Sequence, residues 1–99
     1  MSRVNLGGSR WFSVAAARAW YEDRRWDGSN HISLATGSQW EHEALYRTAG
    51  GAWVHHCWSQ GHGSGASYEV IAEERAHAWL IAQGHSGDVP AAVVAHAEA

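Results

Sequence analysis

The chain has 99 residues, seven arginines, no lysine and a formal net charge of −3 with neutral histidines. This length is typical of a single domain, so we expect residues 1–99 to fold as one unit. The small acidic net charge argues against a nucleic-acid binder that relies on a basic stripe. Eight histidines are present, so charge and partner choice should depend on pH between about 5 and 7.

Cysteine content and hydropathy indicate the compartment. The only cysteine is Cys57, which excludes an internal disulfide. The N-terminus lacks the basic-then-apolar order of a signal peptide, and no apolar run approaches the ~20 residues of a membrane-spanning helix. We therefore expect a soluble cytoplasmic protein with no membrane partner and no cofactor.

The N-terminal quarter predicts a hairpin followed by a helix. Residues 3–6 and 9–12 flank Gly7-Gly8, a tight-turn signal between two short apolar runs. Ser13 can cap a helix that begins at Val14 and ends near Arg25. Helical spacing places four of its side chains on one face: Val14, Ala17, Trp20 and Tyr21.

The middle of the chain predicts an antiparallel meander of three strands, at residues 31–36, 40–48 and 52–59. A two-residue turn at Ala49-Gly50 would pair Tyr46 with Trp53 and His42 with Cys57. One face would then carry Trp40, His42, Ala44, Tyr46, Trp53, His55 and Cys57. We expect this more apolar face to meet the helices. The other face would be free, with Glu41, Glu43, Leu45, Val54, His56 and Trp58.

The C-terminal third predicts a glycine-rich loop at residues 60–67 and then a helix from Glu73 to Gln83. Two glutamates occupy its first turn and Gly84 ends it. Its inner stripe is Ala76, Trp79, Leu80 and Gln83. Residues 85–99 form either a short helix or a frayed tail. The fold class is therefore α+β, in the order ββαβββα.

A longer pattern resembles known sequences. Residues 35–43 read ATGSQWEHE and residues 45–48 read LYRT. Together with the later Trp53, Trp58-Ser59 and Ala78-Trp79-Leu80, they resemble an uncharacterised family of small tryptophan-rich proteins of bacteria and mobile elements. The resemblance covers most of residues 20–85 and implies no activity, cofactor or catalytic residue.

Metal and thiol chemistry centres on His42, His55 and Cys57, with His62 as a fourth candidate ligand. Thiolate and imidazole are zinc ligands, but the chain lacks the paired spacings of zinc sites, which favours packed or surface histidines. Cys57 beside His42 could act as a nucleophile with its base, although a cysteine in a central strand more often packs as a small hydrophobe. Residues 61–65 lack the lysine and the following helix of a phosphate-binding loop.

The preferred function is a non-enzymatic protein-binding module, by analogy with phage- or plasmid-borne inhibitors such as anti-CRISPR proteins. The expected contact residues lie on or near the free sheet face: Trp58, Glu41, Glu43, Arg47 and His56. The same face could instead form a homodimer, or be covered by another layer of the chain. One alternative is a nucleic-acid-associated regulator using Arg24, Arg25 and Arg47. Another is a small metal- or cysteine-dependent enzyme.

Overall fold

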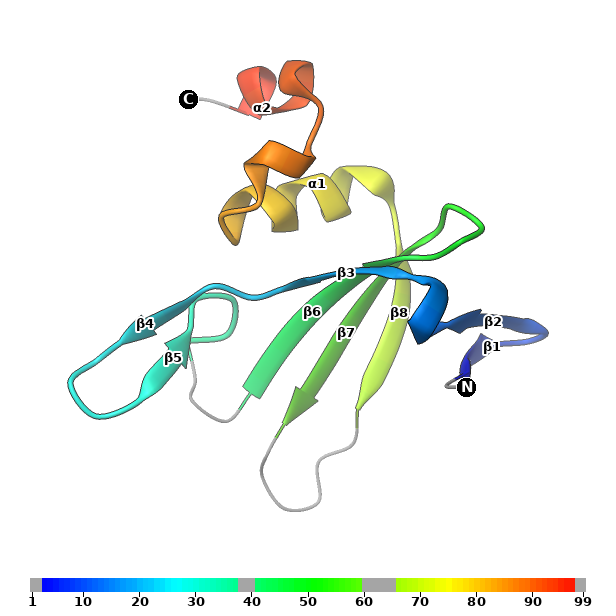
Figure 1. Cartoon of the computed structure of the whole chain (residues 1–99), viewed down its shortest axis with the longest axis horizontal. Coiled ribbons are helices and arrows are strands. Elements are labelled where there is room, and N and C mark those ends of the chain that lie inside the picture. The colour runs from blue at the N-terminus through cyan, green and yellow to red at the C-terminus, as the bar shows by residue number, and fades with distance from the viewer. Residues whose placement is uncertain (1–2, 38–40, 60–65, 98–99) are drawn as a thin grey trace.

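The computed structural model describes residues 3–37, 41–59 and 66–97. Its centre is a four-stranded antiparallel sheet, two short hairpins extend from the sheet in opposite directions, and the two α-helices lie together at one end (Figure 1). In chain order the elements are β1 Arg3–Gly7, β2 Arg10–Ser13, η1 Val14–Ala16, β3 Arg18–Tyr21, β4 Arg24–Trp26, β5 His31–Ser33, β6 Glu41–Arg47, β7 Trp53–Ser59, β8 Ser67–Ile71, α1 Glu73–Ala82, η2 Ser86–Asp88 and α2 Ala91–Ala97. The class is α+β, as predicted.

The central sheet has the strand order β3-β6-β7-β8 and is covered on both faces. One apolar cluster joins the sheet to α1 and η2, through Trp20, Leu45, Trp53, Ile71, Ala76, Leu80 and Val89. A second cluster joins the opposite face to the β1–β2 hairpin, through Phe12, Ala44, Tyr46 and Val54. The prediction that Leu45 and Val54 share an uncovered face is therefore wrong. Both side chains are fully buried, and they lie on opposite faces of the sheet.

The predicted β6–β7 hairpin exists, but its register differs by one residue. Arg47 pairs with Trp53, Tyr46 with Val54 and His42 with Trp58. The cause is a three-residue loop in place of the expected Ala49-Gly50 turn. The Thr48 amide donates to the Ala52 carbonyl, and Gly51 closes the loop with a φ of 91°. Because strand side chains alternate, this shift changes which β7 residues share a face with each β6 residue.

The predicted helix over residues 14–25 is wrong. Only Val14–Ala16 is helical, as one 3₁₀ turn, and β3 pairs along β6 with Trp20 opposite Leu45. The helix propensity of alanine amounts to a few tenths of a kcal/mol per residue, whereas burying one large side chain contributes roughly 1.5–3 kcal/mol. Trp20 is 6 % exposed and its ring lies 5.5 Å from that of Trp53, so tertiary packing decides the conformation.

The predicted strand 31–36 is correct only for His31–Ser33, and it pairs with β4 in a separate two-stranded sheet. The meander of the central sheet is instead β6–β7–β8, with Trp53 opposite Ile71. Strand β8 was not predicted, and its first residue, Ser67, falls in the expected glycine-rich loop. Trp40 of the predicted second strand lies outside the described residues.

The second predicted helix is confirmed as α1. His85 donates to the Leu80 carbonyl and Gly84 donates to the Ile81 carbonyl, with Gly84 at a φ of 82°. This pair of hydrogen bonds is a Schellman motif, which ends the helix where glycine was expected to end it. The tail forms the short helix α2. None of the helices in the described ranges is long and apolar enough to span a membrane.

Candidate functional site

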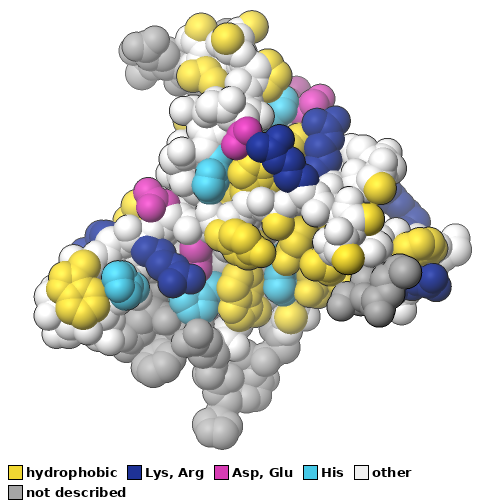
Figure 2. Space-filling model, viewed as in Figure 1, with side chains coloured by type: hydrophobic (Ala, Val, Ile, Leu, Met, Phe, Trp, Pro, Cys, Tyr) yellow, Lys and Arg dark blue, Asp and Glu magenta, His cyan; other side chains and the backbone are white. Residues whose placement is uncertain are grey.

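From Tyr21, the last residue of β3, to Leu34, the chain leads out of the central sheet into an extension that we call the arm. It contains the β4–β5 hairpin and lies at the left of the molecule in Figure 1. Three large apolar side chains stay in solvent along it: Tyr21 is 59 % exposed, Trp26 60 % and Leu34 46 %. Figure 2 shows a hydrophobic ring, a histidine and an arginine side by side over this extension.

The hairpin register explains which side chains of the arm gather. Arg24 pairs with Ser33 and Trp26 pairs with His31, whose rings are 5.0 Å apart. Residues two apart in a strand share a face, so Arg24 and Trp26 lie on the same side. Asp27 closes the turn by accepting the amides of Ser29 and Asn30. Those amides, with Asn30 contributing most, lower the pKa of the Asp27 carboxyl.

Buried hydrogen bonds attach the arm to the sheet through Glu22, whose side chain is only 1 % exposed. One carboxylate oxygen lies 2.5 Å from Nδ1 of His42, and the other accepts the hydroxyl of Ser33 and, at 3.4 Å, the amide of Glu43. The Asp23 amide also donates to the side-chain carbonyl of Gln83 at 2.9 Å. These contacts join β3, β5, β6 and the end of α1, so the base of the arm is held in one orientation.

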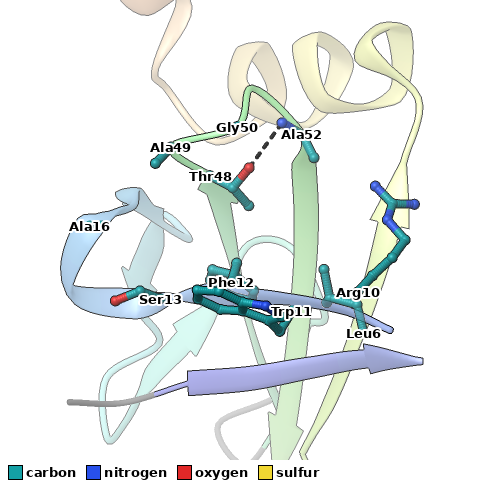
Figure 3. A pocket seen from close by; sticks show the side chains of 10 residues that line it. All are labelled: Leu6, Arg10, Trp11, Phe12, Ser13, Ala16, Thr48, Ala49, Gly50 and Ala52. Atoms are coloured by element: carbon teal, nitrogen blue, oxygen red, sulfur yellow. Dashed lines mark hydrogen bonds between the residues drawn. The ribbon is translucent and has the colours of Figure 1, made fainter. Parts of the chain in front are cut away.

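A second exposed tryptophan lies on the β1–β2 hairpin. Trp11 is 51 % exposed and borders a pocket of about 340 Å³ between this hairpin and the β6–β7 loop. Figure 3 shows Trp11 and Phe12 on one side of this pocket and Thr48 and Ala52 across it. The Arg3 guanidinium already lies 4.2 Å from the Trp11 ring centroid. One side of the Trp11 ring therefore has an internal cation–π partner.

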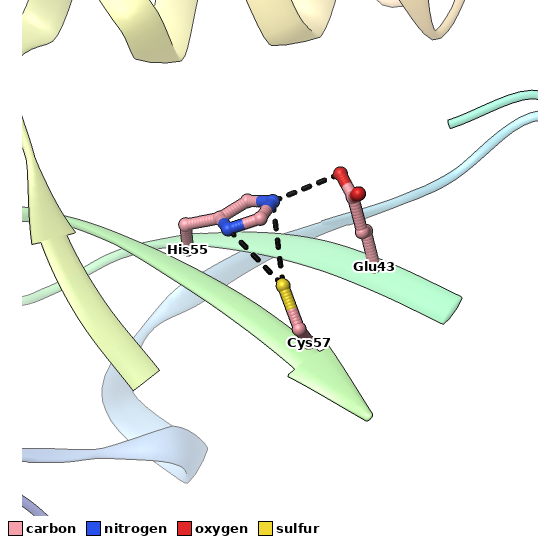
Figure 4. A group of neighbouring side chains, drawn as sticks. All are labelled: Glu43, His55 and Cys57. Atoms are coloured by element: carbon pink, nitrogen blue, oxygen red, sulfur yellow. Dashed lines mark hydrogen bonds and ion pairs between the residues drawn. The ribbon is translucent and has the colours of Figure 1, made fainter. Parts of the chain in front are cut away.

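A compact polar cluster lies on the α1 side of the sheet. His55 and Cys57 alternate along β7 and share a face, and Glu43 of β6 is directly opposite Cys57. The Nε2 atom of His55 is 2.9 Å from a Glu43 carboxylate oxygen, and the Cys57 sulfur is 3.4 Å from Nδ1 (Figure 4). The indole N–H of Trp79 donates to the same Glu43 oxygen at 2.8 Å. Helix α1 thus holds the carboxylate in place.

The electrostatics of this cluster do not match an activated thiol. Burial raises the pKa of Cys57, and the carboxylates of Glu43 and Glu69 raise it further, against a lowering by the hydrogen bond with Ser67. Its sulfur lies 3.4 Å from Nδ1 and 4.0 Å from Nε2 of His55, beside the ring rather than in line with one nitrogen. A nucleophilic cysteine needs a lowered pKa.

The predicted contact residues do not form one surface. Trp58 and His56 lie on the face of the β1–β2 hairpin, where His56 stacks on Tyr68 at 4.1 Å. Burial, followed by the charge of His55, lowers the pKa of His56. Glu41, Glu43 and Arg47 belong to the opposite face, and the Arg47 guanidinium lies 4.9 Å from the Trp53 ring centroid. The Glu43 carboxylate contacts His55, which also lies on the α1 face.

The predicted metal ligands likewise lie on both faces of the sheet. His42 pairs with Glu22 on the far side of the sheet from Cys57, so the expected Cys57–His42 pair is wrong. His55 and Cys57 do come together, with Glu43 as the third member, while His62 lies outside the described residues. Neither the exposure of Trp26 nor the burial of Glu22 was predicted. The Asp27-Gly28 turn directly after Trp26 was the one signal of a hairpin tip.

None of the protein-family models, curated proteins or solved structures compared with the chain matches it.

Proposed function

We propose that the protein is a non-enzymatic protein-binding module and that the arm is its contact surface. The observation that supports this proposal is the concentration of exposed apolar area in one short segment. Among the described residues, the large hydrophobic side chains in solvent are Tyr21, Trp26 and Leu34 of the arm and Trp11. Exposed apolar patches beside polar groups are typical of interaction sites, and Trp, Tyr and Arg dominate binding energies there.

The charges of the arm favour an acidic partner. Asp23 and Asp27 accept backbone amides of the arm itself, from Arg24 and from Ser29 and Asn30. Within the described part of the chain the guanidinium groups of Arg24 and Arg25 form no salt bridge. Asp23 and Asp27 are exposed as well, so the two arginines beside Trp26 are the charges of the arm that we assign to an outside carboxylate. They fit a protein surface that offers carboxylates around an apolar recess, where arginine forms bidentate pairs.

A protein partner is favoured over a nucleic acid by the number and balance of charges. The arm has two arginines against two aspartates and Glu22, and the whole chain has a net charge of −3. Tight nucleic-acid binding usually neutralises many phosphates, for which two cations are few. The Glu22 contacts hold the base of the arm before binding, which lowers the entropy lost on association. Obstruction of a partner's own binding site, as by a phage or plasmid inhibitor, is the mode of action that we propose.

The test is affinity capture with the tagged full chain from nuclease-treated extract of its native cells. Three baits are compared: the wild type, Trp26→Ala and the matched control Trp11→Ala, which removes an exposed tryptophan from the other hairpin. A protein recovered by both the wild type and Trp11→Ala is then titrated by calorimetry. Removing a central tryptophan typically weakens binding by 2 kcal/mol or more, so Trp26→Ala should raise Kd at least ~30-fold.

Two results would contradict the proposal. One is a partner whose affinity falls equally for Trp26→Ala and Trp11→Ala, because the arm would then have no special part. The other comes from a parallel capture out of extract that has not been treated with nuclease. It is the recovery of nucleic acid and no protein, with binding that weakens steeply as salt rises. The latter result would favour the alternative of a nucleic-acid-associated regulator.

A further inference from the structure

We propose that Glu43, His55 and Cys57 form a three-ligand site for a zinc-class divalent transition-metal ion. The site lies on the α1 side of the central sheet and shares no residue with the arm. The three residues are partly buried, and one ligand atom from each lies within 4.8 Å of the others. Figure 4 shows Nε2 of His55 facing both the Glu43 carboxylate and the Cys57 sulfur.

The distances between the ligand atoms fit one shared ion. Nε2 of His55 is 2.9 Å from the Glu43 oxygen and 4.0 Å from the Cys57 sulfur. Around a tetrahedral zinc ion with bonds of about 2.0–2.3 Å, neighbouring ligand atoms lie roughly 3.3–3.6 Å apart. The observed values bracket this range. Binding would therefore require side-chain rotations that lengthen the first distance and shorten the second.

The chemistry of the three groups selects the ion. A thiolate, an imidazole and a carboxylate are the ligand types that zinc takes in proteins, whereas calcium and magnesium prefer oxygen alone. On binding, the sulfur–metal bond replaces the sulfur–hydrogen bond and the proton passes to solvent. Two anionic ligands, one neutral imidazole and a dication give a site with no net charge. This neutrality suits side chains as enclosed as His55 and Glu43, which are 16 % and 21 % exposed.

The surroundings supply the support that metal sites need. Trp79 of α1 donates to the Glu43 oxygen at 2.8 Å, which fixes the orientation of the carboxylate. Glu43 and Cys57 also line a pocket of about 360 Å³ at the end of the sheet. This pocket leaves room for a water molecule or another small ligand at a fourth position of the ion.

The direct test is equilibrium dialysis of the folded full chain against zinc chloride, followed by metal quantification and cobalt substitution. One ion per chain is expected, and the cobalt form should show a sulfur-to-metal charge-transfer band in the near ultraviolet. Cys57→Ser and His55→Gln should weaken binding at least tenfold. The matched control, His56→Phe, changes the neighbouring histidine on the opposite face and should bind zinc as the wild type does.

A second measurement needs no variant. Cys57 is the only cysteine, so alkylation detected by mass spectrometry reports on this thiol alone. Saturating zinc should slow the alkylation of the wild type at least tenfold, and a chelator should restore the rate. The proposal is overturned if zinc leaves the rate unchanged, or if His56→Phe reduces zinc binding as much as His55→Gln does.

Discussion

Replacing Glu22 with alanine should destabilise the protein strongly, because this carboxylate is a buried acceptor for groups from several elements. Its side chain is 1 % exposed and that of its partner His42 is 9 % exposed. The substitution leaves the His42 Nδ1 atom and the Ser33 hydroxyl without their acceptor in a buried site. Breaking a buried pair by removing one partner typically costs about 3–5 kcal/mol. A domain of this size has roughly 5–15 kcal/mol of stability in total.

Urea denaturation followed by tryptophan fluorescence measures the loss of unfolding free energy. Glu22→Gln keeps the shape and part of the hydrogen bonding, so we expect an intermediate loss of about 1–2 kcal/mol. Glu69→Ala is the surface control; its carboxylate is 67 % exposed and pairs with the exposed Arg75, so the change should stay within about 0.5 kcal/mol. Hydrogen exchange should also quicken at the Leu34 amide, which donates to the Asp23 carbonyl. If Glu22→Ala cost less than about 1 kcal/mol, the buried contacts would not be what holds the arm.

Three further predictions concern the core and its rim. Leu45→Ala should cost about 3–5 kcal/mol in urea denaturation, because Leu45 is fully buried beneath α1. His56→Phe should raise the free energy of unfolding by about 1 kcal/mol, because within the described structure both ring nitrogens are buried without a hydrogen-bond partner; an unchanged or lower melting temperature would contradict this. Asp88→Asn should lower the melting temperature at pH 7, and this effect should shrink as the pH falls below 3.8. The Trp20 indole N–H, followed by Arg18, lowers the pKa of Asp88 from its ordinary 3.8, so the stabilisation is present above that value and is lost as the pH falls through the lowered pKa. Thermal melts over this pH range compare wild type and variant.

The elements that could be predicted from the sequence are those fixed by local chemistry. The glutamates at the start of α1, its inner stripe and Gly84 predicted this helix to within one residue at its end. Gly7-Gly8 predicted the β1–β2 hairpin. The apolar runs before and after the loop at residues 48–52 predicted β6 and β7. His55 and Cys57 were also singled out together as candidate ligands, since their chemistry can be read from residue type.

The features that depend on residues far apart in the sequence could be found only from the tertiary structure. Residues 18–21 fit a helix by composition and become a strand because β6 offers an edge and Trp53 offers a surface for Trp20. Nothing near Glu22 in the sequence indicates a buried carboxylate, because its partners His42 and Ser33 lie on other strands. The face of each β7 side chain depended on one extra loop residue, Gly51. A strand alternates sides at every residue, so this single residue brought Glu43, rather than His42, to Cys57.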